Sequence, residues 1–284
     1  MYTQSITRSH RTAFVLLIDG SGSMAEEIAF RGIRVSKAKA VSLITNELIF
    51  ELIERARRSE GIRDYYDIAI LGYSGDDEVC SLLPGGDQMI SIADLAAQPI
   101  TMVSRTVELK LPDGRCALRE VQTPQWIAPR AVGQTPMIEA MRMARDLVAG
   151  WIAREEHNES FPPIVFNITD GEATDGTDEE LLSVARQIRS LATQDGNTLL
   201  VHIHIGAGDL RTLFFPGADE SLPINHHART LYEASSEMPA CFNKAIRSAK
   251  GAGSLPPFRG MSFNASAADL LTMLDIGSIS VKTE

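Results

Sequence analysis

The stretch AFVLLIDGSGSM at residues 13–24 decides the fold. The run before Asp19 is entirely apolar, which is typical of a central parallel strand that is buried on both faces. The alternating glycines that follow Asp19 allow the backbone to turn tightly. One carboxylate and two hydroxyls, from Asp19, Ser21 and Ser23, are therefore expected together at the carboxyl end of a buried strand.

Strand patterns alternate with helix patterns along the rest of the chain. Further strands are predicted at residues 66–73, 164–169 and 198–205, and helices at about 33–58, 135–154 and 178–191. Additional helical patterns lie near residues 228–233, 239–250 and 267–276. This alternation predicts an α/β fold, with a doubly wound, mostly parallel central sheet flanked by helices.

The length of 284 residues fits one α/β domain with an insertion, so a single domain is predicted over residues 1–284. Its core spans about residues 12–206. The irregular segment at about 75–132 has β-like pieces and a turn at 112–114, and we interpret it as an insertion that contains a β-hairpin. Residues from about 207–284 are expected to form a helical extension.

Composition excludes several classes of partner and site. A net charge of −10 argues against nucleic acid, because contacts to phosphates need clustered Lys and Arg. The three cysteines, Cys80, Cys116 and Cys241, are odd in number and far apart, so they predict neither a disulfide framework nor a zinc site. The chain has no apolar stretch long enough for a signal or a membrane span, and we expect a cytoplasmic protein.

Two later loops repeat the pattern of polar residues after a strand or before a helix. Thr135 opens one predicted helix, and Asp170 directly follows the strand at 164–169. Each feature alone is also explained by a turn or a helix cap. Because the carboxyl ends of parallel strands meet at one edge, Asp19, Ser21, Ser23, Thr135 and Asp170 are expected to converge there. Their hard oxygens are the ligands that Mg²⁺ or Mn²⁺ prefers.

This set of residues resembles the metal-ion-dependent adhesion site (MIDAS) of the von Willebrand factor A (VWA) and integrin I-domain family. The family pattern is Asp-x-Ser-x-Ser, then a Thr before a helix, then an Asp after a later strand, and all five positions are filled here. The resemblance implies a VWA/Rossmann-like fold and a metal that the Ser and Thr hydroxyls contact directly, often with the aspartates acting through water. It further implies adhesion without catalysis, in which the metal accepts a Glu or Asp side chain of a protein partner.

The C-terminal region carries a second resemblance. Residues 231–239 (LYEASSEMP) and 258–264 (FRGMSFN) are similar to the tails of bacterial stand-alone VWA proteins of the tellurite-resistance type. Those proteins often occur with a protein kinase and a PP2C-like phosphatase. The similarity implies a role in a bacterial stress-response or phospho-signalling complex, with a kinase or phosphatase as partner.

The sequence lacks the common signatures of an enzyme. The sequence has no phosphate-binding G-x-x-x-x-G-K-[ST] loop, no G-x-S-x-G elbow and no H-E-x-x-H motif. A phosphotransfer enzyme of the haloacid dehalogenase type needs a second Asp where Ser21 stands, which makes a metal-dependent phosphotransferase the weaker alternative. The stronger alternative is a scaffold subunit with a vestigial metal site.

Four histidines could form a second metal site. They are His202, His204, His226 and His227. A second metal site and hydrogen-bonded histidines beneath a covering helix or loop are both compatible with their spacing, and the second interpretation is favoured because no Cys or carboxylate has ligand spacing with them.

Overall fold

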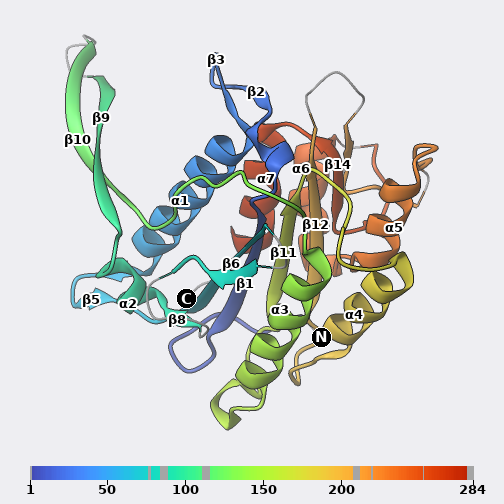
Figure 1. Cartoon of the computed structure of the whole chain (residues 1–284). Helices are drawn as coiled ribbons and strands as arrows, with labels where there is room; N and C mark the ends of the chain where they lie inside the picture. Colours follow the sequence, from blue (N-terminus) through green and yellow to red (C-terminus); the bar gives the residue numbers. More distant parts are fainter. Residues whose placement is uncertain are drawn as a thin grey trace.

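A mixed, mostly parallel sheet forms the centre of the molecule, and helices flank it on both faces (Figure 1). The structure, a computed structural model, describes residues 2–75, 78–83, 89–110, 116–206, 212–218, 220–251 and 253–279. The strand order is β13-β14-β12-β11-β1-β6-β7, with β8 also paired to β6. The predicted fold class is confirmed.

The parallel strands are β1 (Thr12–Asp19), β6 (Tyr66–Ser74), β11 (Ile164–Thr169), β12 (Leu199–Ile205) and β14 (Met261–Ala265). From β1 the chain passes to β6 on one side of the sheet and later to β11 on the other. The order of strands therefore reverses between β1 and β11. In open α/β sheets such a switch point, at the carboxyl ends of the strands, is where ligands bind.

Strand β1 is buried along its whole length because both of its faces are covered. Phe14, Leu16 and Ile18 pack in the core beneath α1 (Lys37–Ala56) and α7 (Ala267–Ile279). Val15 and Leu17 pack in a second core beneath α3 (Met137–Ile152) and α4 (Asp178–Ser190). The alternation of side chains across the sheet explains why the whole run is apolar.

The remaining elements border this centre. The antiparallel edge strands are β7 (Glu78–Ser81), β8 (Ile90–Ser91) and β13 (Leu213–Phe214). The shorter helices are α2 (Ile92–Ala96), α5 (His226–Ala234) and α6 (Asn243–Lys250), with 3₁₀ turns at Gly22–Ala25, Glu155–His157 and Ala240–Phe242. Strands β4 (Arg57–Arg58) and β5 (Gly61–Ile62) form a short antiparallel pair. Among the helices that the structure describes, none combines the length and apolarity needed to span a membrane.

The predicted helix at about 33–58 begins later than expected, so that prediction was wrong at its start. Residues before it form a hairpin of β2 (Glu27–Phe30) and β3 (Ile33–Ser36). The turn uses positive φ values at Arg31 (50°) and Gly32 (83°), which suit a two-residue hairpin loop. Ser36 then caps α1, because its hydroxyl accepts the Lys39 amide hydrogen at 3.2 Å.

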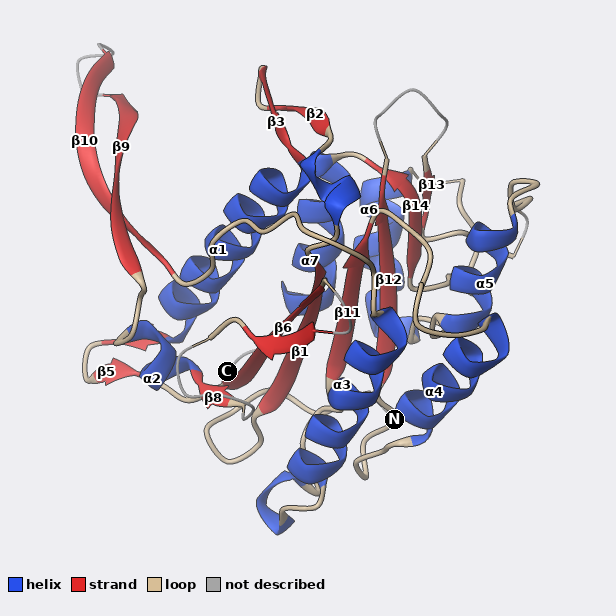
Figure 2. Cartoon of the chain, in the orientation of Figure 1, coloured by secondary structure: helices blue, strands red, loops and turns tan. Residues whose placement is uncertain are grey.

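The insertion contains the predicted hairpin, formed by β9 (Thr101–Lys110) and β10 (Cys116–Gln125). The predicted turn at 112–114 lies outside the described residues. Figure 2 shows that this hairpin and the β2–β3 hairpin both project away from the sheet. The insertion also extends the central sheet itself, through β7 and β8 at the edge of β6.

The C-terminal region is not only helical, which corrects the predicted helical extension. It supplies β14, which pairs in parallel with β12, and β13, which pairs with β14. The central sheet therefore continues beyond residue 206. Strand β14 is short and bears Ser262 and Asn264 between its apolar residues, so its sequence lacks the continuous apolar run that marks β1.

Asn46 in α1 fixes the segment that leads from the insertion back to the site. Its side-chain oxygen accepts the amide hydrogens of Trp126 at 2.6 Å and Ile127 at 3.1 Å. Its side-chain nitrogen donates to the carbonyls of Ser42 and Ile127. All of these residues are buried, so the loss of the Asn46 side chain would leave buried polar groups without a hydrogen-bond partner.

We expect Asn46→Leu to lower the free energy of unfolding by about 2–4 kcal/mol, because the buried amide hydrogens of Trp126 and Ile127 lose their acceptor. Urea denaturation measures this change. Gln98→Leu, at an exposed position, is the control and should change the free energy by less than about 0.5 kcal/mol. Equal stability of the two variants would contradict the assigned role of Asn46.

Candidate metal centre

Asp19 lies at the end of β1 and is almost fully buried, with 1% of its surface exposed. One carboxylate oxygen accepts the Ser21 amide hydrogen at 2.8 Å, and the other accepts the Thr169 hydroxyl at 2.7 Å. Burial raises the pKa of Asp19, and the hydrogen bonds from Thr169 and Ser21 oppose that increase. The carboxylate is therefore fixed in position by the ends of two neighbouring strands.

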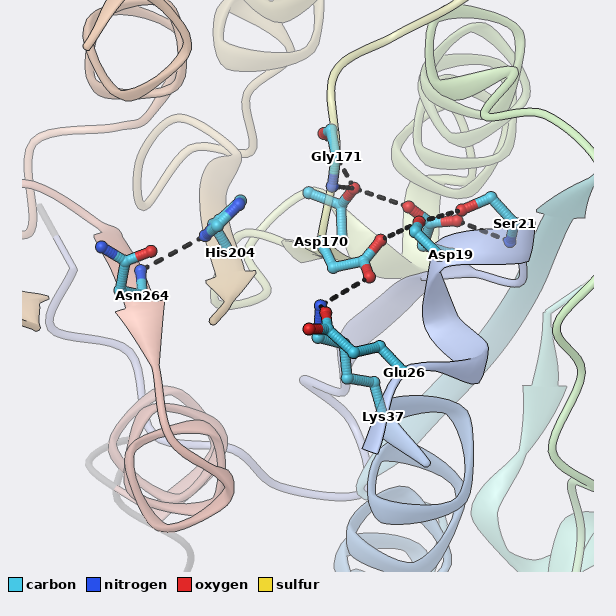
Figure 3. A network of polar contacts seen from close by, with 10 residues as sticks. Asp19, Ser21, Glu26, Lys37, Asp170, Gly171, His204 and Asn264 are labelled. Atoms are coloured by element: carbon cyan, nitrogen blue, oxygen red, sulfur yellow. Dashed lines mark hydrogen bonds and ion pairs between the residues drawn. The ribbon is translucent and has the colours of Figure 1, made fainter. Parts of the chain in front are cut away.

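Ser23 connects this loop to Asp170, which follows β11. The Ser21 and Ser23 hydroxyl oxygens lie 3.1 Å apart, and the Ser23 hydroxyl donates to Asp170 Oδ1 at 2.6 Å. The Asp170 side chain has no exposed surface. Four of the five predicted site residues are thus linked by hydrogen bonds or a close hydroxyl contact at the switch point of the sheet (Figure 3).

The backbone of the first loop is held by the segment before Thr135. The Gly22 amide donates to the Gly133 carbonyl at 2.9 Å, and the Val132 amide donates to the Gly20 carbonyl at 2.7 Å. Gly133 has φ +75°, and a Cβ at this position would lie 2.3 Å from the Cα of Gly75. Only glycine allows this close approach of the two chains.

Thr135, the fifth predicted residue, lies beside the turn that carries Asp170. A methyl group on Gly171 would lie 4.0 Å from the Thr135 hydroxyl oxygen. The Thr135 amide donates to the Thr174 hydroxyl at 3.0 Å, and its carbonyl accepts the Thr174 amide hydrogen at 3.0 Å. The second and third loops are therefore joined directly, and all five predicted residues lie in one region.

Asp175, which the sequence did not single out, caps helix α3. Its carboxylate accepts the amide hydrogens of Ile138 at 3.1 Å and Glu139 at 2.8 Å. Pro136 lies immediately before the helix, with ψ 63°, so α3 begins two residues after the predicted start at Thr135. Because the cap comes from the loop after Asp170, no local capping motif near residue 137 could have indicated it.

Lys37 is the second residue that sequence reasoning missed. Its ammonium lies 3.0 Å from Asp170 Oδ2 and 2.5 Å from a Glu26 carboxylate oxygen, and only 6% of its side chain is exposed. Burial alone would lower the pKa of Lys37, but the hydrogen bonds to Glu26 and Asp170 outweigh it and raise the pKa. Lys37 and Asp170 are 133 residues apart, so no local motif relates them.

The donor set fits a hard divalent cation. The buried carboxylates of Asp19 and Asp170 lie beside the hydroxyls of Ser21 and Ser23, and Thr135 lies next to the turn after Asp170. A buried ammonium already balances part of the charge on Asp170. Across the described ranges, no group of three or more His, Cys, Asp or Glu side chains is placed to hold a metal. A metal at this centre would therefore depend on hydroxyl ligands from Ser21, Ser23 and Thr135.

His202, His204 and His227 are packed in the fold, whereas the His226 side chain is exposed and pairs with Asp178. His202 Nδ1 accepts from the Asn167 side-chain amide at 3.1 Å, and burial lowers the pKa of His202 to about 3. His204 stacks on Phe263 with 4.2 Å between ring centroids, and burial lowers its pKa to about 4. The surroundings of His202 and His204 agree with the prediction of histidines packed within the fold.

Comparisons with known proteins found no matching protein family and no matching curated protein. Several solved structures are similar to the chain. A von Willebrand factor type A protein from Catenulispora acidiphila aligns with 69% of the chain at 17% identity and a TM-score of 0.40. The chain spans only 34% of that protein's length. The vWF domain of the type V pili tip protein Mfa5 from Porphyromonas gingivalis aligns with 97% of each chain at 10% identity and a TM-score of 0.46. An uncharacterized membrane spanning protein from Vibrio fischeri covers 70% of this chain and 73% of its own, at 16% identity and a TM-score of 0.26.

Acid should destabilise the protein through His202. Its pKa falls from 6.5 to about 3 on folding, so the unfolded state binds more protons below pH 6.5 and stability decreases as the pH falls. Between about pH 7.5 and about pH 5 this loss amounts to about 2 kcal/mol. Urea denaturation at several pH values should give a shallower decline for His202→Gln. His10→Gln is the control, and equal slopes for wild type and His202→Gln would contradict the prediction.

We expect Gly133→Ala to lower the free energy of unfolding by about 2 kcal/mol or more, because the new methyl group meets the Gly75 backbone at a positive φ. Thermal unfolding measures the change. Gly150→Ala in α3 is the matched control, since nothing lies within 4 Å of its added methyl group, and it should stabilise the protein by about 0.5–1 kcal/mol. A neutral Gly133→Ala would contradict the close approach of the two loops.

Proposed function

We propose that this chain is a VWA domain that acts as a metal-dependent protein–protein interaction module. The observation that carries the proposal is the convergence of Asp19, Ser21, Ser23, Thr135 and Asp170 at the switch point between β1 and β11. These are the five positions of the MIDAS pattern in the sequence. The module has no catalytic role in this proposal.

The hydroxyls of Ser21, Ser23 and Thr135 would contact Mg²⁺ or Mn²⁺, and Asp19 and Asp170 would support it. When bound, the metal supplies a positive charge that accepts a Glu or Asp carboxylate of the partner. Both Asp19 oxygens already accept hydrogen bonds within the protein, which favours a supporting position behind the hydroxyls. Carboxylates kept behind the hydroxyls leave the cation more strongly attracting for an incoming anion.

The charge of the chain gives a physical reason for metal dependence. A net charge of −10 repels an acidic partner at long range, so binding needs local positive charge at the contact. Lys37 is nearby, but its ammonium already pairs with Asp170 and Glu26. A divalent cation would provide the missing charge.

The similarity of the tail to tellurite-resistance-type proteins extends the proposal. The partner is a protein kinase or a PP2C-like phosphatase in a bacterial stress-response or phospho-signalling complex, and the interaction takes place in the cytoplasm. This part of the proposal rests on sequence resemblance in residues 231–239 and 258–264.

One observation favours a second candidate, a scaffold subunit with a vestigial metal site. The Lys37 ammonium already satisfies Asp170, so the buried carboxylate has a cationic partner without a metal. In that case the partner would bind by surface contacts that do not depend on divalent cations.

Calorimetric titration with Mg²⁺ and with Mn²⁺ separates these two candidates. The wild type should bind one divalent cation, and Ser21→Ala combined with Ser23→Ala should weaken binding by at least about tenfold, because two ligand oxygens are lost. Ser59→Ala, in an exposed turn, is the control for serine removal. The kinase and phosphatase candidates are then tested for binding in Mg²⁺ and in EDTA. Absence of metal binding, or partner binding that is equal in both buffers, would favour the scaffold.

A further inference from the structure

Lys37 lies where two factors, the helix dipole and burial, disfavour a positive charge. It is the first residue of α1, where the helix dipole disfavours positive charge, and its side chain is buried. Two carboxylates compensate it, Asp170 at 3.0 Å and Glu26 at 2.5 Å. Removing the lysine would therefore leave the buried Asp170 carboxylate without its cationic partner.

The same Asp170 carboxylate serves both the candidate metal centre and Lys37. Its Oδ1 accepts from the Ser23 hydroxyl, and its Oδ2 accepts from the Lys37 ammonium (Figure 3). A divalent cation held by Ser21 and Ser23 would meet this positive charge as a near neighbour. Two positive charges that share one carboxylate repel each other strongly in a buried site.

Glu26 provides the ammonium with a second partner on the exposed side. Its side chain is 56% exposed, and the pairing with Lys37 lowers the pKa of Glu26. The Glu26 amide donates to the Ser23 carbonyl at 2.9 Å, and the Lys37 amide donates to the Glu26 carbonyl at 2.8 Å. The pair therefore ties the first site loop to the start of α1, with the β2–β3 hairpin between them.

We propose that Lys37 is a built-in counter-cation that competes with the divalent metal for Asp170. The inference rests on the proposed metal-dependent function. Lys37 neutralises Asp170 when no divalent cation is bound, and it lowers the affinity of the centre for that cation. A partner carboxylate adds negative charge and offsets this repulsion, so metal and partner bind with positive cooperativity. Lys37 is a positioning residue that acts through Asp170.

Calorimetric titration of Mg²⁺ into the full chain tests the competition. Lys37→Met removes the charge but keeps most of the side-chain volume, and it should bind Mg²⁺ at least about tenfold more tightly than the wild type. Lys37→Arg keeps the charge and should stay within about threefold. Lys39→Met removes a charge from the same turn of α1 and controls for the change in net charge.

Thermal unfolding gives a readout that is independent of metal affinity. In EDTA, Lys37→Met should unfold at a lower temperature than the wild type, because the buried Asp170 carboxylate loses its cation. Mg²⁺ should remove most of this difference. A Lys37→Met protein that is destabilised equally in EDTA and in Mg²⁺ would contradict the competition.

Glu26→Gln provides a second test at an exposed position where folding is not at risk. The ammonium then depends on Asp170 alone, and Mg²⁺ binding should weaken by about threefold or more. Glu27→Gln removes a neighbouring exposed charge and is the matched control. In the Lys37→Met background, Glu26→Gln should lose its excess effect over the control.

The outcomes distinguish the inference from the function on which it rests. If neither the wild type nor Lys37→Met binds Mg²⁺ or Mn²⁺, the proposed metal-dependent function fails and the inference fails with it. If both bind with equal affinity, the metal centre stands and only the counter-cation is overturned. Tighter binding by Lys37→Met, with Lys37→Arg and Lys39→Met close to the wild type, supports the competition.

Discussion

Two carboxylates of like charge lie buried at the ends of neighbouring strands, and the surrounding loops are arranged to keep them there. Asp19 ends β1, and Asp170 follows β11 in the adjacent position of the sheet. The charge of Asp170 adds to the burial that raises the pKa of Asp19. Hydrogen bonds from Ser21, Ser23 and Thr169, together with the Lys37 ammonium, offset the cost of this arrangement.

The loop after Asp170 connects this charged centre to helix α3. Thr174 makes two hydrogen bonds with the backbone of Thr135, and Asp175 caps the first turn of the helix. The backbone of Thr135 and the start of α3 are therefore held by the segment that carries Asp170. The loop after Asp170 and the first turn of α3 thus form one hydrogen-bonded unit.

Lys37 gives the centre a property that the MIDAS pattern alone does not contain. A pattern of five oxygen-bearing residues describes what a metal would contact, whereas the buried ammonium determines how much negative charge those residues present. With Glu26 on its exposed side, the ammonium has two carboxylates between which its charge is shared. The electrostatic balance of the centre thus depends on the β2–β3 hairpin that joins Glu26 to Lys37 as well as on the five oxygen-bearing residues themselves.

The sequence by itself determined the fold class and the five candidate ligands. The apolar run at residues 13–18 and the mostly apolar stretch at 164–169 indicated buried parallel strands. Polar residues at the carboxyl ends of such strands meet at one edge of the sheet. It placed the start of α1 wrongly, because apolar residues at 33 and 35 fit both a strand and a helix, and it missed β14, which has no continuous apolar run. Only the tertiary structure decided the roles of Lys37 and Asp175. Their partners are distant in the sequence, and a contact between distant residues leaves no periodicity or local motif from which it could be predicted.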